Sequence, residues 1–99
     1  MADNLMNVLK TLDEKLFDLV GASRAFSFED GALPKKTKYL IALSLDAAHG
    51  AVEGVRALAM QALKSGATKE EIMETLRVAH FISGAGSIYT AARALEGIL

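Results

Sequence analysis

The sequence predicts an all-α protein, folded as one compact domain of five or six helices. Hydrophobic residues make up 52% of the chain, and they recur at spacings of three and four, which is typical of amphipathic helices. The chain contains a single proline, and the strict alternation of apolar and polar residues that marks strands is scarce. Its 99 residues suffice for one domain and are too few for two, so residues 1–99 are expected to fold together.

The first helix is expected to run from Asp3, a suitable N-cap, to about Val20. Gly21 follows, and the segment from Ala22 to Gly31 is expected to hold a short helical piece. The apolar residues of the first helix line one face: Leu5, Val8, Leu9, Leu12, Leu16, Leu19 and Val20. The aromatic residues nearby and later in the chain are expected to fill the core: Phe26, Phe28 and Phe81.

Local signals place two long helices in the middle of the chain. The first begins at Pro34, a residue favoured in the first turn, and ends at Gly50. The next is expected from about Ala51 to Ser65, with Gly66 as its left-handed terminator.

Two further helices are expected in the last third of the chain. Thr68 and Glu71 have the spacing of a capping box, in which each side chain binds a free backbone N–H of the first turn. That helix should reach about Ile82. The small-residue break SGAGS then leads into a final helix from Ile88 to about Ile98.

Composition excludes several classes of function. The net charge is −1 and the Lys and Arg residues are spread along the chain, so no basic surface for nucleic acid or anionic lipid is evident. The lysine cluster at Lys35, Lys36 and Lys38 lies near Glu29 and Asp30, which favours a solvated helix start over a phosphate site. No apolar run is long enough to span a bilayer, and the N-terminus lacks a secretory pattern, so we expect a cytoplasmic protein.

The chain has no cysteine, which rules out disulfides, thiolate nucleophiles and cysteine-ligated metals. We expect neither a metal nor another cofactor.

The helix expected at residues 51–65 is apolar on nearly every side. Val52, Val55, Ala59, Ala62 and Leu63 form one face, and a second set of apolar residues lies elsewhere on the helix: Ala57, Leu58 and Met60. Such a helix must be covered on nearly every side, which a small monomer achieves poorly. We therefore expect a homo-oligomer with Ala57, Leu58 and Met60 in its interface. The alternative is a helix that is central to its own domain.

Three stretches give the chain a family resemblance: LPKKTKYLIALSLDAAHG, ALKSGATKEEIMETLRVA and YTAARALEGIL. Over residues 31–98 they resemble the carboxymuconolactone decarboxylase and AhpD-like alkylhydroperoxidase family. The resemblance implies the helical fold of that family and assembly as a trimer or hexamer. It also implies a possible redox site, because the redox members carry a Glu, a Cys-x-x-Cys pair and a His.

Counted back from Gly66, the resemblance places the family's two Cys at Ala51 and Gly54, its His at Leu58 and its Glu at Tyr39. All four groups of this relay are replaced, and Tyr39 is a poor base at neutral pH. The decarboxylase branch of the family resembles the redox members in having a His at the position of Leu58, and it has another His near Val78. Both positions are apolar in this chain. Cysteine-dependent peroxidase chemistry is therefore excluded.

Four polar residues remain as catalytic candidates: Tyr39, Asp46, His49 and His80. Asp46 and His49 are three residues apart and share a helical face. His49 is also suited to the end of its helix, and His80 to a core or interface position. Asp46, His49 and His80 have the composition of a facial metal site, but the spacing is common and we predict no metal.

Two functional interpretations follow. The first is a non-catalytic oligomeric scaffold with the family fold, whose replaced relay reflects either drift or redesign; we favour a scaffold or an engineered variant. The second is a cofactor-free enzyme that uses Tyr39, Asp46, His49 and His80 for decarboxylation or lactone chemistry. Its small carboxylate substrate would need a cation, and Lys38 or Arg56 are the nearest candidates.

Overall fold

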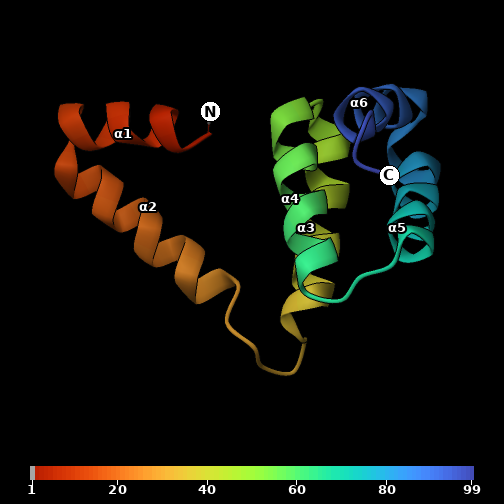
Figure 1. The fold of residues 1–99 in the computed structure, drawn as a ribbon, viewed down its shortest axis with the longest axis horizontal. Coiled ribbons are helices and arrows are strands. Elements are labelled where there is room, and N and C mark those ends of the chain that lie inside the picture. Colours follow the sequence, from red (N-terminus) through yellow and green to blue (C-terminus); the bar gives the residue numbers. More distant parts are fainter. Residues whose placement is uncertain (1) are drawn as a thin grey trace.

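The computed structural model describes residues 2–99, with side chains from Met6 onward, and these residues form six helices. The helices are α1 (Ala2–Leu12), α2 (Glu14–Ser27), α3 (Lys35–His49), α4 (Val52–Lys64), α5 (Lys69–Ser83) and α6 (Ala85–Leu95). The prediction of a compact all-helical domain with five or six helices is confirmed. Figure 1 shows two parts: a body built from α3 to α6, and a hairpin of α1 and α2 beside it.

The expected single helix from Asp3 to Val20 is two helices, so that prediction was wrong. The break is at Asp13, whose carboxylate accepts a hydrogen bond of 2.9 Å from the Leu16 backbone N–H and so caps a new helix. The helix α1 already includes residue 2, and the predicted capping role of Asp3 and the side chain of Leu5 lie outside the described residues.

The helix α2 continues past Gly21, where a helix end had been expected, and reaches Ser27. None of its residues is buried, and it packs mainly on α1. Its aromatic side chains therefore do not reach the core as predicted. Phe26 is 75% exposed, while Phe28 is half-buried and stacks on Tyr39. Phe81 near the end of α5 is 85% exposed, which also contradicts its expected core position.

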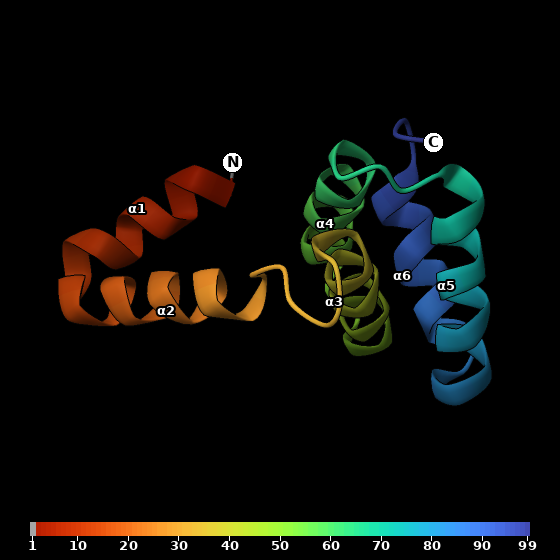
Figure 2. The same cartoon turned by 90° about the horizontal axis from the view of Figure 1, so that it is seen from below.

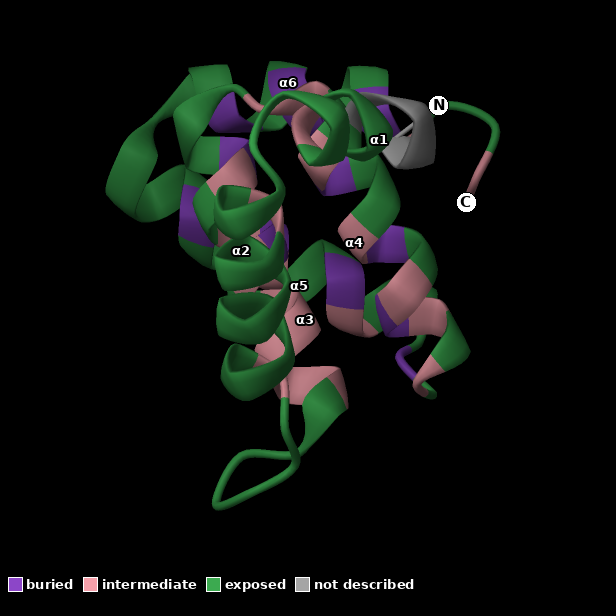
Figure 3. Cartoon of the chain, turned by 90° about the vertical axis from the view of Figure 1, so that its left-hand side faces the viewer, coloured by how far each residue is buried: buried purple, intermediate pink, exposed green. Residues whose placement is uncertain are grey.

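The core lies among the four helices of the body. Its central members, led by Leu43 and Ile72, come from α3, α4, α5 and α6: Leu43, Ala47, Val55, Ala59, Ile72, Leu76, Ala91 and Ala94. Four of these eight are alanines, so the helices approach one another closely. Figure 2 shows α3 next to α4 and α5 next to α6, with α1 and α2 projecting away. Figure 3 shows exposed residues along the whole of α2, whereas buried segments occur on α3 to α6.

The predicted ends of α3, α4 and α5 are confirmed to within a residue or two. Gly50 and Gly66 follow α3 and α4 with positive φ angles of 79° and 97°. The capping box is present: the Glu71 backbone N–H donates to Thr68 Oγ1 at 3.1 Å, and the Thr68 N–H donates to Glu71 Oε1 at 2.8 Å. These helix ends could be predicted because the residues that form them interact only within their own turn.

The last helix begins at Ala85 and ends at Leu95, in each case three residues earlier than predicted. Gly84 alone forms the break, with a φ of 86°, and serves as the cap of both α5 and α6. Ser87 then lies in the first turn, buried, and its hydroxyl donates to the Gly84 carbonyl at 2.7 Å. In the part of the chain that the structure describes, no helix is long and apolar enough to cross a bilayer.

Candidate functional site

A cavity of about 460 Å³ lies between the end of α2 and the adjoining parts of α3 and α4. Its lining combines apolar side chains with one cation, one carboxylate and one imidazole: Arg24, Phe28, Ala42, Leu45, Asp46, His49, Gly54, Ala57 and Leu58. The cavity therefore adjoins the segment where the family resemblance places the redox groups.

The start of α4 brings no reactive side chain to this cavity. Ala51 is the N-cap residue and makes no side-chain capping bond; its backbone N–H donates to the Asp46 carbonyl at 2.9 Å. Gly54 follows in the first turn and Leu58 one turn later, and both line the cavity. Leu58 also packs against the core. Three of the four expected relay positions thus lie together, but they present only hydrogen or hydrocarbon.

The side chain of Asp46 lies close against Gly54. A β-carbon added at Gly54 would lie 2.0 Å from Asp46 Oδ2 and 2.8 Å from Asp46 Cγ, far inside van der Waals contact. In its present rotamer, the carboxylate of Asp46 consequently occupies the volume that a side chain at position 54 would need. The two residues form a matched pair across α3 and α4.

Tyr39, the fourth relay position, is on α3 and does not line this cavity. Its ring stacks on Phe28, with centroids 4.8 Å apart and planes 23° from parallel. Phe28 does line the cavity, so Tyr39 packs against a lining residue without lining the cavity itself. This stack is also a direct contact between the end of the hairpin and the body.

Asp46 and His49 are brought to the same cavity, as their spacing of three on α3 predicts. His49 is the last residue of α3 and is exposed. Arg24 is the cation among the residues that line the cavity. Of the two cations proposed from sequence, the Lys38 ammonium donates to the Glu29 carbonyl in the loop before α3. The guanidinium of Arg56 donates to the carbonyls of Ala94 and Glu96 at 3.2 and 3.1 Å, at the end of α6.

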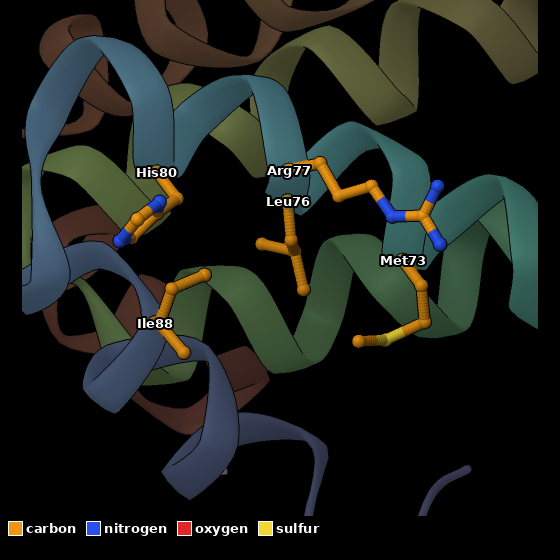
Figure 4. A pocket seen from close by; sticks show the side chains of 5 residues that line it. All are labelled: Met73, Leu76, Arg77, His80 and Ile88. Carbon is orange, nitrogen blue, oxygen red and sulfur yellow. The ribbon is translucent and has the colours of Figure 1, made fainter.

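His80 lies elsewhere. It lines a separate cavity of about 530 Å³ between α5 and α6, with Met73, Leu76, Arg77 and Ile88. Figure 4 shows Leu76 of α5 and Ile88 of α6 pointing into this cavity, while the Arg77 side chain extends along α5. The four candidates do not share one cavity: Asp46 and His49 are together, and Tyr39 and His80 are apart from them. Among the described side chains, no group of three His, Asp or Glu residues could hold a metal ion.

Sequence reasoning missed Arg24 and Phe28 as cavity residues. The first helix was expected to end before Gly21, so the helical periodicity was not extended to Arg24 and Phe28. In the continuous helix α2, this periodicity puts both residues on one face. Continuing the register past Gly21 would have shown that they share a face. Their position beside α3 depends on the path of residues 28–34, which no local signal determines.

Comparison with known proteins identifies the family. The model of the carboxymuconolactone decarboxylase family matches residues 10–97, and the chain belongs to that family. A crystal structure of a carboxymuconolactone decarboxylase family protein from Legionella pneumophila, in its apo form, is similar, with a TM-score of 0.89 and 32% sequence identity. The similarity covers 96% of this chain and 85% of the Legionella chain. No curated protein matches the chain.

Proposed function

We propose that this protein is a non-catalytic, self-assembling member of the carboxymuconolactone decarboxylase family, which forms a trimer or hexamer. The observation that supports the loss of chemistry is the pair of Asp46 and Gly54, because the carboxylate fills the place of a reactive side chain. The observation that supports assembly is the open apolar flank of α4, where Met60 is 46% exposed and Ala57 is exposed.

Light scattering after size-exclusion chromatography tests assembly directly. We expect a mass of three or six chains, and a monomer near 10.5 kDa would contradict the proposal. Met60→Glu should reduce the assembled fraction, because it puts a charge in the proposed contact. Glu53→Gln, also on α4, changes a residue that is already exposed and serves as the matched control.

Restoring the relay tests the loss of chemistry. The fourfold variant Tyr39→Glu, Ala51→Cys, Gly54→Cys and Leu58→His supplies every group of the redox members. In the parent background its new side chain at position 54 collides with Asp46. We therefore expect peroxide reduction with a thiol donor only when Asp46→Ala is added. Equal activity with and without that fifth change would show that Asp46 does not block the site, and peroxide reduction by the parent chain would contradict the proposal.

A second candidate function rests on one specific observation, the convergence of Arg24, Asp46 and His49 on the cavity. In this function Arg24 would bind the carboxylate of a small substrate, and Asp46 and His49 would move a proton during decarboxylation or lactone opening. Carboxymuconolactone is the first probe, with release of carbon dioxide as the readout. Turnover that is abolished by His49→Ala and retained by His80→Ala would favour this function, because His80 lines a different cavity.

A cytoplasmic location and an engineered origin stay predictions from the sequence. The absence of cysteine suits both.

A further inference from the structure

The hairpin of α1 and α2, here called the arm (residues 2–27), exposes a long apolar surface. Leu12 is 78% exposed, and six other large hydrophobic side chains of the arm are exposed as well. The full set is Met6, Val8, Leu12, Leu16, Leu19, Val20 and Phe26. The two helices have 11 and 14 residues and pack mainly on each other. Helices this short draw most of their stability from tertiary packing, so the arm requires a cover that the chain itself does not supply.

The body presents a second open apolar surface on the side of the arm. On α3, Ile41 and Leu45 are 44% and 55% exposed, and on α4 Ala57 and Leu58 line the same region. We call these four residues the wall. Two cavities, of about 220 and 460 Å³, lie between the wall and the end of α2. Figures 1 and 2 both show the arm on this side of the body and separated from it along most of its length.

We propose that the space between arm and wall receives the arm of a second copy of this chain, so that neighbouring copies exchange arms. This inference rests on the proposed self-assembly and names the surface that carries it. In the exchanged arrangement, each arm covers the wall of a neighbour and narrows the cavity that holds Arg24, Asp46 and His49. The cavity is then completed by two chains.

A second copy fits better than an unrelated partner because one exchange covers both open surfaces. Every copy carries one arm and one wall, so each contact uses the arm of one chain and the wall of another. The seven arm side chains expose on the order of 500 Å² of apolar surface, and the wall adds roughly 200 Å². Together they approach the ~800 Å² per partner that a specific interface buries.

The position of the arm recurs in a crystallised relative. The similarity to the Legionella protein covers 96% of this chain with a TM-score of 0.89. The arm is about a quarter of the chain, so a score this high requires the arm to lie in a similar place in both proteins. A projecting arm is therefore shared by two proteins that are 32% identical, which is expected if the arm serves assembly.

The absence of cysteine allows a specific cross-linking test. A chain with Leu19→Cys is mixed with a differently tagged chain with Leu45→Cys, the assemblies are dissociated and reformed together, and a short bismaleimide is added. We expect a covalent dimer of one chain of each kind. A chain with Glu74→Cys, an exposed position on α5, replaces the Leu45→Cys chain as the matched control and should give little product.

Light scattering on charge variants provides the second measurement. Leu12→Glu with Leu19→Glu should shift the protein to monomer, because both carboxylates would be buried against the wall. Phe81→Glu changes an equally exposed hydrophobic residue at the far end of α5 and should leave the mass unchanged. Helix content measured by circular dichroism verifies that the body remains folded.

The outcomes separate this inference from the proposed self-assembly. A monomeric parent chain would overturn both. An assembled parent that gives no mixed cross-link, and stays assembled with Leu12→Glu and Leu19→Glu, would overturn arm exchange and leave self-assembly standing. A double variant with Leu19→Cys and Leu45→Cys that cross-links only within one chain would show that the arm closes onto its own wall, which also overturns the exchange.

Discussion

Gly54→Ala changes stability in a direction that depends on Asp46. In a helix, alanine is more favourable than glycine by roughly 0.5–1 kcal/mol. At position 54 the added methyl group would lie 2.0 Å from Asp46 Oδ2, so the carboxylate must move. Asp46 is half-buried beside a cavity, so its carboxylate has room to turn, and we expect the displacement to cost about 1–2 kcal/mol, in the lower part of the range for overpacked sites. The cost exceeds the gain, and we expect Gly54→Ala to destabilise the parent by about 1 kcal/mol.

The same substitution should be stabilising when Asp46 is first replaced. In the Asp46→Ala background the collision disappears and only the helical preference remains, so Gly54→Ala should add roughly 0.5–1 kcal/mol. The coupling between the two positions is then about 1–2 kcal/mol, which is well within the range measured for residues in contact.

Thermal unfolding of the four proteins in this double-mutant cycle measures the coupling. For a domain of this size 1 kcal/mol moves the Tm by about 4–8 °C. Gly54→Ala should therefore lower the Tm in the parent and raise it with Asp46→Ala. All four are compared at one protein concentration, because assembly makes the Tm depend on concentration. Equal shifts in both backgrounds would refute the steric argument.

Three further predictions concern the body. Thr68→Ala removes the cap on the Glu71 N–H and should cost about 1 kcal/mol in urea unfolding, and an unchanged midpoint would contradict this role. The Thr68 backbone N–H, followed by Lys36, lowers the pKa of Glu71 below its usual value near 4.5. The resulting stability is present above that value and is lost as the pH falls through the lowered pKa, so Glu71→Gln should reduce the loss of stability between pH 7 and pH 3. Ile72→Ala should cost about 2–5 kcal/mol because Ile72 is fully buried, whereas Met73→Ala, at a half-exposed position, should cost much less; similar costs would place the core elsewhere.

The helices of the body could be predicted from sequence because their end signals are local. Gly50 and Gly66 end their helices through their own φ angles, and Thr68 with Glu71 begins α5 through bonds within one turn. The break at Asp13 was missed because an Asp inside an amphipathic pattern has two uses, as a surface residue or as a cap, and the spacing of the apolar residues continues across it.

The candidate site was predictable only in part. The register of the family and the spacing on α3 indicated positions that the structure brings to one cavity: Gly54 and Leu58 of α4, and Asp46 and His49 of α3. The contribution of Arg24 depends on how residues 28–34 return the chain toward α3, which is a tertiary effect. The exposure of Phe26 has the same origin, because hydrophobicity alone does not reveal whether a helix packs against its own body.

The fit between residues 46 and 54 limits the order in which this chain and a thiol-bearing relative can be converted into each other. A carboxylate at position 46 in its present rotamer excludes every residue except glycine at position 54. While Asp46 keeps this rotamer, aspartate at 46 therefore goes together with glycine at 54, and a route back to a thiol changes position 46 first. Intermediates with Asp at 46 and Cys at 54 would carry the collision, so the return route to a working thiol begins at a residue that is not one of the redox groups.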